Sequence, residues 1–203
     1  MSRTLYKKTA FRAILAIAIV VAVLALLFAV EQTRTQVEMG VVLSAYLSDE
    51  VLHNAHDWGS GRGVQMVMQR EAQSPGNWRW RWAMLLDKRS WFPESSRTSR
   101  FSFFLTNLFV TDVQAELHLP SDVTPVFVSR KELERTEPND FQTRFPYNFG
   151  YIAVSHIGLN LTKSEAIFYI DHFCGLCGGG GYVVMRKVNG QWHVADQHST
   201  WVS

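Results

Sequence analysis

The chain begins with one long, uninterrupted apolar segment. Residues 13–30 read AILAIAIVVAVLALLFAV, a run without any charged or polar side chain. As a helix this run would extend about 27 Å, close to the thickness of the hydrocarbon core of a bilayer. Lipid offers no hydrogen-bond partner to the backbone, so a helix is the structure expected there. The pattern therefore predicts a transmembrane anchor over residues 13–30.

Charged residues are distributed unevenly around this apolar segment. Four basic residues precede it and no acidic residue does. They are Arg3, Lys7, Lys8 and Arg12. Because basic flanks remain in the cytoplasm, we expect residues 1–12 to form a cytoplasmic tail and residues 31–203 to form an extracytoplasmic domain.

Two other interpretations of the segment remain open. A cleaved signal peptide would have a shorter apolar region and small residues at its cleavage site, whereas the segment ends in Leu27-Phe28-Ala29-Val30. A buried core helix would not need the one-sided charge. The pattern favours a signal-anchor, which is a single-pass transmembrane helix that is not cleaved.

Helical periodicity continues beyond the anchor. Apolar side chains recur at four-residue spacing within residues 31–56, at Met39, Leu43, Leu47 and Val51. This spacing is typical of a helix with one buried face. We expect a helix that either extends the anchor as a stalk or packs on the domain's sheet.

The middle of the chain has weaker signals. Residues 101–113 are rich in aromatic and apolar side chains and fit either a strand or a helix, and residues 124–129 read as a short strand. Ser129 and Glu132 have the spacing of a helix-capping box. A short helix is therefore predicted after Ser129, and it must end before Pro138.

The last third of the chain has the pattern of a β-sheet. Asn189-Gly190 is a strong hairpin signal because both positions accept a positive φ, and the glycine-rich residues 174–181 predict a connection. We expect an α+β fold with a four-strand antiparallel β-meander over residues 150–203 and helices on one face of the sheet. The predicted strands are residues 150–157, 165–173, 182–188 and 191–202.

Tryptophan and arginine alternate in one short stretch, Trp78-Arg79-Trp80-Arg81-Trp82. In a strand this alternation puts the three indoles on one face and the two guanidinium groups on the other. A half-buried strand with a solvated face is the simpler interpretation. The functional alternative is a binding surface for lipid headgroups, where both side chains are favourable.

Composition excludes three classes of protein. Four of the 20 basic side chains precede the apolar run, and all 18 acidic ones follow it. The domain is therefore nearly neutral and lacks the basic surface that nucleic-acid binding needs. The two cysteines, Cys174 and Cys177, are too few for a disulfide scaffold or a zinc ribbon within one chain. We expect no cofactor.

Cys174 and Cys177 form a CxxC motif with several interpretations. An oxidising compartment favours a local disulfide, which would stiffen the loop more than it stabilises the fold. Redox catalysis would need a helix N-terminus to lower the thiol pKa, and four glycines follow instead. A metal site would use both thiols and His172 but would still lack a fourth ligand. Inert reduced thiols are the remaining interpretation.

The seven histidines of the chain do not form a recognisable catalytic pattern. Asp171 and His172 are adjacent in a predicted strand and face opposite sides. His193 and Asp196 are separated by an odd number of positions and are likewise expected on opposite sides. A triad could still assemble across strands, but the sequence selects none.

The C-terminal third, roughly residues 141–203, contains a set of short motifs: Phe145-Pro146, Ser155-His156-Ile157-Gly158-Leu159-Asn160, Ala166, Tyr169, the Cys174–Gly181 loop with Tyr182, Gly190-Gln191-Trp192 and Trp201-Val202-Ser203. With this set the region resembles a family of exported or membrane-anchored bacterial proteins of unknown function. The resemblance implies a β-rich exported domain in a bacterial envelope, and the family brings no established activity.

These features predict a membrane-anchored module that binds another envelope protein or an envelope component through its sheet or its aromatic side chains. The expected location is the bacterial inner (plasma) membrane, with the domain in the periplasm. The alternative is an envelope enzyme, either a hydrolase that uses histidines of the sheet or a thiol-redox protein that uses Cys174 and Cys177. The two hypotheses differ in one structural expectation: an enzyme should gather at least two of His156, His172, His193 and His198 with a carboxylate in one pocket.

Overall fold

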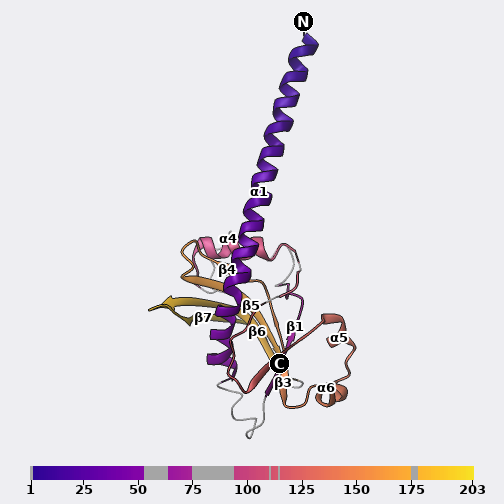
Figure 1. The fold of residues 1–203 in the computed structure, drawn as a ribbon, viewed down its shortest axis with the longest axis vertical. Helices are drawn as coiled ribbons and strands as arrows, with labels where there is room; N and C mark the ends of the chain where they lie inside the picture. The colour runs from indigo at the N-terminus through magenta and orange to yellow at the C-terminus, as the bar shows by residue number, and fades with distance from the viewer. Residues whose placement is uncertain (1, 53–63, 75–93, 110, 114, 175–177) are drawn as a thin grey trace.

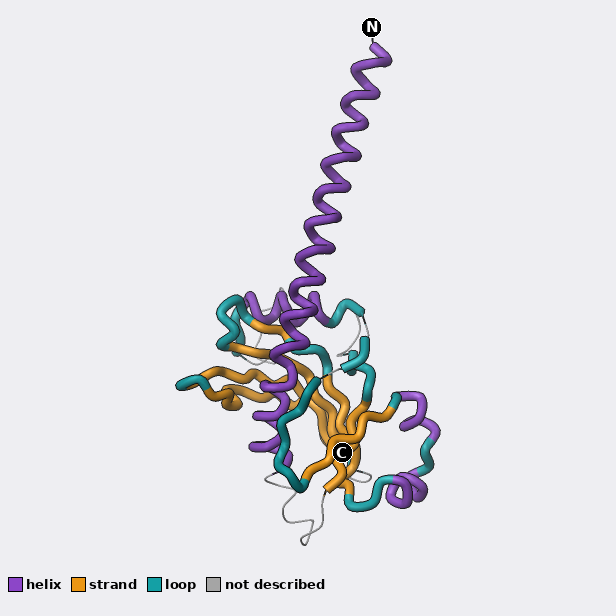
Figure 2. Tube along the Cα trace, in the orientation of Figure 1, coloured by secondary structure: helices purple, strands orange, loops and turns teal. Residues whose placement is uncertain are grey.

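The computed structural model describes residues 2–52, 64–74, 94–109, 111–113, 115–174 and 178–203. One long helix projects from a mixed domain of helices and a sheet (Figures 1 and 2). The stretch Trp78–Trp82 and Cys177 lie outside the described residues, so the predictions made for them are not tested.

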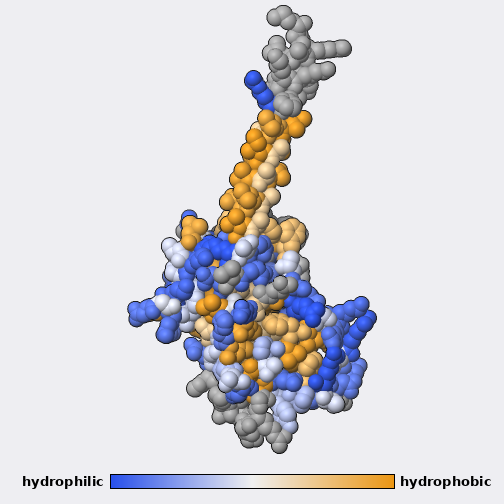
Figure 3. All heavy atoms as spheres, in the orientation of Figure 1, coloured by the Kyte–Doolittle hydropathy of each residue, from blue (hydrophilic) through white to orange (hydrophobic). Residues whose placement is uncertain are grey.

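The projecting helix is α1 (Ser2–Tyr46), which continues as the π-helix η1 (Leu47–Leu52). Within α1, Ile14–Gln36 is long and apolar enough to cross a membrane, and none of its most apolar stretch is buried. Figure 3 shows apolar side chains covering this part of α1, above a largely hydrophilic domain surface. The predicted anchor and the predicted helix that follows it are therefore one continuous helix.

The sheet has the strand order β2-β1-β3-β5-β6-β7, and β4 pairs separately with β5. β1 is parallel to both β2 and β3, whereas the pairs from β3 to β7 are antiparallel. The strands are β1 (Val64–Gln69), β2 (Val123–Val128), β3 (Asn148–Val154), β4 (Gly158–Leu159), β5 (Glu165–Phe173), β6 (Gly178–Val188) and β7 (Gln191–Val202).

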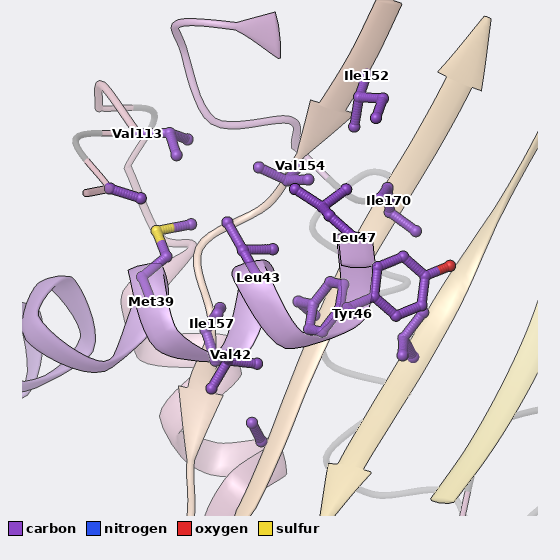
Figure 4. Packing of buried hydrophobic residues seen from close by; sticks show 14 of the residues in the cluster. Met39, Val42, Leu43, Tyr46, Leu47, Val113, Ile152, Val154, Ile157 and Ile170 are labelled. Carbon is purple, nitrogen blue, oxygen red and sulfur yellow. The ribbon is translucent and has the colours of Figure 1, made fainter. Parts of the chain in front are cut away.

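The C-terminal half of α1 packs on one face of this sheet, which we call the α1 face. Figure 4 shows Met39, Leu43 and Leu47 beside strand residues such as Ile152 and Val154. All five side chains are fully buried. The periodicity that predicted a helix with one buried face is thus satisfied by contact with the sheet, as in other helix-on-sheet layers.

Three shorter helices cover the opposite face, which we call the α4 face. Phe103 of α4 (Arg97–Thr106) packs on Ile167 and Tyr182. Leu133 of α5 (Arg130–Arg135) and Phe145, just after α6 (Pro138–Arg144), pack in a cluster with the β-strand residues Val67 and Val128. The expectation of helices on only one face is therefore wrong, because alternating strand residues are apolar on both sides.

Several local predictions are confirmed. The Ser129 hydroxyl accepts a hydrogen bond from the Glu132 amide at 3.3 Å, which caps α5 as the spacing indicated. Asn189 and Gly190 have φ values of 52° and 84°, as the hairpin between β6 and β7 requires. The strand predicted over residues 165–173 coincides with β5, and the one over residues 191–202 coincides with β7.

Other local predictions need correction. Gly178–Gly181 belong to β6 and all pair with β5, and Gly179–Gly181 also pair with β7, so the glycines are not part of a loop. The sheet is larger than a four-strand meander. The short strand predicted over residues 124–129 is confirmed as β2, and it joins the sheet through β1, a parallel strand that the hydrophobic pattern did not reveal. Of residues 101–113, those up to Thr106 are helical.

Candidate functional site

A buried carboxylate lies at the centre of a polar cluster on the α4 face. Asp171 of β5 is 2% exposed. Its Oδ1 accepts hydrogen bonds from the Tyr169 hydroxyl at 2.9 Å and from Trp201 Nε1 at 2.7 Å, and its Oδ2 accepts one from Gln73 Nε2 at 2.8 Å. These three donors come from different parts of the chain, so Asp171 fixes their relative positions.

The electrostatics of Asp171 follow from its environment. Burial raises the pKa of its carboxyl above the ordinary value, although the bonds from Trp201, Tyr169 and Gln73 oppose the rise. Burial also raises the pKa of the Tyr169 phenol, and Asp171 adds to this effect. The phenol therefore stays protonated at neutral pH and remains a donor to the carboxylate.

A glycine in β6 makes room for this cluster. Gly180 pairs with Asp171 on one side and with Trp201 on the other. A Cβ at Gly180 would collide with Asp171 Oδ1 and with Trp201 Nε1. Only a residue without a side chain allows the indole to reach across β6 to the carboxylate.

Three aromatic rings form a row beside the carboxylate, and we call Tyr151, Phe173 and Trp201 the aromatic row. Tyr151 stacks on Phe173 with centroids 4.6 Å apart and planes 20° apart, and Phe173 lies 5.3 Å from the Trp201 ring. Phe141 of α6 extends the row, 6.2 Å from Tyr151. All three rings of the row are partly exposed.

The row offers an apolar, uncharged surface. Burial raises the pKa of the Tyr151 phenol, and Asp171 raises it further, so the ring carries no charge at neutral pH. Aromatic rings offer a large contact area and have few rotamers to lose on binding. This arrangement is suited to binding a partner rather than to proton transfer or nucleophilic attack.

Of the residues predicted to form a disulfide or a metal site, those that the structure describes lie next to Phe173, at the end of β5. Cys174 directly follows Phe173, and His172 lies on the opposite face of β5 from Asp171, as expected. In the described part of the chain, no group of three or more His, Cys, Asp or Glu side chains is placed to hold a metal ion. The disulfide between Cys174 and Cys177 stays a prediction.

The predicted opposition of His193 and Asp196 is wrong. Asp196 pairs with Val184 and His193 pairs with Arg186, and the register shifts between these pairs. Val184 and Arg186 are two residues apart in β6 and share the α4 face, so their partners share it too. A β-bulge in this region places both side chains on one face of the sheet, which strict alternation of side chains along a strand does not predict.

His156 is isolated in the interior. It is fully buried, and its Nε2 lies 2.6 Å from the Thr111 hydroxyl. Within the described residues its Nδ1 has no hydrogen-bond partner. Burial lowers the pKa of His156, so the imidazole is neutral at physiological pH.

A second buried carboxylate, Glu165, has a structural role. Its Oε1 accepts hydrogen bonds from the Ser96 amide and the Ser99 hydroxyl, both at 2.6 Å, and its Oε2 accepts one from Arg186 Nε at 3.1 Å. Burial alone would raise the pKa of Glu165, but these bonds together lower it. Glu165 thus holds the start of α4 against β5.

A surface hollow of about 450 Å³ lies at α5 and α6, and no histidine lines it. Arg144 and Glu132 form an ion pair there. The gathering of histidines with a carboxylate that an enzyme would need is not found in this hollow. Its lining residues are Ser129, Lys131, Glu132, Arg135, Thr136, Asp140 and Arg144.

Sequence reasoning missed the aromatic row and Asp171. One signal was available: alternation in β5 puts Tyr169, Asp171 and Phe173 on one face, with an acid between two aromatic residues. The other members come from distant segments that no local pattern connects.

The chain matches no protein-family model, no curated protein and no solved structure in the comparisons made.

The isolation of His156 predicts a pH dependence of stability. Its pKa in the folded protein lies below the value of about 6.5 in the unfolded chain. The unfolded chain therefore takes up the proton first, and His156 contributes stability that is present above pH 6.5 and is lost as the pH falls toward the folded pKa.

The variant His156→Gln should not show this decrease in stability at low pH, because glutamine does not titrate. As the pH falls below 6.5, the unfolding free energy of the wild type should decrease relative to that of the variant by up to about 1.4 kcal/mol per pH unit. Denaturant unfolding between pH 7 and pH 5 measures it, with the exposed His193→Gln as control. Equal pH slopes for wild type and His156→Gln would contradict the prediction.

Proposed function

We propose that the protein is a signal-anchored, single-pass protein of the bacterial plasma membrane, with its N-terminus in the cytoplasm and its domain in the periplasm. The support is the exposed apolar part of α1 together with the four basic residues that precede it. In that compartment Cys174 and Cys177 would be oxidised, and their disulfide would stiffen the connection next to Phe173.

We further propose that the domain binds another envelope protein through the aromatic row. The observation that carries this proposal is that Tyr151, Phe173 and Trp201 remain partly exposed while being held in fixed positions. Tyr and Trp are the residues that most often dominate the energy of protein interfaces. Rings that are ordered before binding lose little entropy when a partner packs on them.

The positions of the rings have a clear origin. Trp201 is held by its bond to Asp171, and Phe173 is sandwiched between Tyr151 and Trp201. The acid is fully used in orienting Trp201, Tyr169 and Gln73, so it supports the surface from beneath. An enzyme is the weaker alternative, because no histidine lines the hollow at α5 and α6, and His172 faces the side of the sheet opposite to His193.

The proposal is tested by capture of a partner from native membranes with the full-length, tagged chain. Phe173→Ala should reduce the affinity for a captured partner by about 30-fold, since truncating a central interface aromatic costs about 2 kcal/mol. Val202→Ser is the control, because Val202 is 81% exposed and makes no ring contact with the row.

The folded state of each variant is checked by its cooperative thermal unfolding. Equal capture by wild type and by a folded Phe173→Ala variant would contradict binding through the aromatic row. Failure of the wild type to retain any partner would contradict the binding role itself.

A further inference from the structure

α4 lies crosswise at the foot of the projecting part of α1 (Figures 1 and 2). The Ser102 hydroxyl donates a hydrogen bond to the Glu31 carboxylate, and Gln32 Nε2 donates one to the Thr106 carbonyl at 3.0 Å. Glu31 is the first charged residue after the apolar run. α4 is therefore attached to α1 at the point where the uninterrupted apolar run ends.

The two sides of α4 have an unusual distribution of polarity. Its buried side includes Ser99, Ser102 and Thr106 besides Phe103. Its outer side and the turn that follows it expose apolar side chains: Phe101 is 54% exposed, Leu108 40% and Phe109 63%. A surface helix of a soluble domain usually buries its apolar side and exposes its polar side, so this arrangement suits contact with an apolar environment outside the domain.

The exposed residues are continuous with the membrane segment. The Phe109 ring packs edge-on against Phe28 of the apolar run, with centroids 5.8 Å apart. Phe28 precedes the end of the run, Val30, by two residues, which is about 3 Å along a helix axis. Phe109 is thus level with the outer edge of the hydrocarbon that α1 would cross.

We propose that α4 and the turn after it dock in the outer interface of the lipid bilayer, through Phe101, Leu108 and Phe109, which we call the α4 patch. Aromatic side chains are enriched at this depth, and interfacial helices insert Phe and Leu while keeping basic residues at headgroup level. The exposed Arg97 at the start of α4 suits anionic headgroups. This inference rests on α1 spanning the membrane and is independent of the aromatic row.

Docking has a structural consequence. α1 alone would fix the domain at one point, but a second contact through the α4 patch also fixes its tilt. Because Glu31 and Gln32 already join α4 to α1, little further ordering is needed when the patch meets lipid. The aromatic row is then presented at a fixed distance from the bilayer.

The experiment uses photo-crosslinking of the full-length chain in vesicles of phosphatidylethanolamine and phosphatidylglycerol. Benzoylphenylalanine is placed at position 109, at position 24 within the apolar run, and at position 202, which is exposed in the domain. Lipid adducts are quantified by mass spectrometry. We expect the adduct yield at position 109 to approach that at position 24 and to exceed clearly that at position 202.

The outcomes separate this inference from the proposed anchoring. A high yield at position 24 with a yield at position 109 as low as that at position 202 would overturn docking of the α4 patch alone. A low yield at position 24 would show that α1 does not span the bilayer and would overturn both. Adducts between position 109 and a second copy of the chain would assign the patch to self-association instead.

Discussion

Two aspartates in the apolar run, Val20→Asp with Leu24→Asp, are expected to release the protein from membranes. Each aspartate at the centre of a transmembrane helix costs about 3 kcal/mol, and the lost apolar side chains add about 0.5 kcal/mol each. The combined cost of about 7 kcal/mol exceeds what the remaining apolar residues can offset. The domain should still fold, since Val20 and Leu24 are 57% and 59% exposed and do not belong to its core.

The measurement is extraction of isolated membranes with alkaline carbonate. The wild type should sediment with the membranes, and the double variant should appear in the supernatant. Val20→Ala with Leu24→Ala is the matched control and should sediment like the wild type, because alanine is tolerated in a membrane helix. A wild-type chain that carbonate removes would contradict the membrane anchor.

Gly180→Ala is expected to destabilise the domain by about 3 kcal/mol. The added methyl group would collide with both Asp171 and Trp201, so either their hydrogen bond or the strand must give way. Overpacking costs about 1–3 kcal/mol, and a buried carboxylate that loses a donor adds a similar amount. In a domain of this size the melting temperature should fall by about 6–12 °C.

Gly179→Ala is a closely matched control one residue away. A methyl group there would meet no atom nearer than 3.4 Å, the Trp201 carbonyl oxygen. Alanine also restricts the unfolded chain, which stabilises a compatible site by about 0.4–1 kcal/mol. Thermal unfolding of both variants decides the matter: equal melting temperatures would show that the Asp171–Trp201 contact does not depend on the missing side chain.

The variants Gly180→Ala and Gly179→Ala also test whether binding depends on the aromatic row. Trp201 reaches Asp171 only across the glycines of β6, so displacing the indole should disorder one end of the row. If binding depends on a preformed row, Gly180→Ala should weaken capture of a partner as well as stability. Gly179→Ala should leave capture unchanged and should not lower stability.

Local sequence patterns predicted the elements whose physics is local. The apolar run indicated the exposed part of α1, the spacing of Ser129 and Glu132 indicated the start of α5, and Asn189-Gly190 indicated the hairpin. Each depends on interactions within a few residues along the chain, whether hydrogen bonds within a helix, a cap or a turn. Such interactions leave a periodic or positional trace in the sequence.

Tertiary structure decided the features that depend on distant partners. The glycines of β6 resembled a loop, but pairing with β5 and β7 makes them strand, and the bulge in β7 reverses the side on which Asp196 lies relative to His193. The sequence indicated β2 as a short strand, but not β1 or the parallel pairing of these strands. Register and strand partners are set by contacts between segments far apart in the chain, which no local pattern encodes.

What the sequence alone determined, then, is a long apolar helix joined to a domain of helices and a mostly antiparallel sheet. The meeting of Gln73, Tyr169, Asp171 and Trp201 was decided by the fold, as was the placement of Phe109 beside Phe28. The physical reason is the same in both cases: a buried hydrogen bond or ring contact forms only after the sheet and α1 have brought separate segments together.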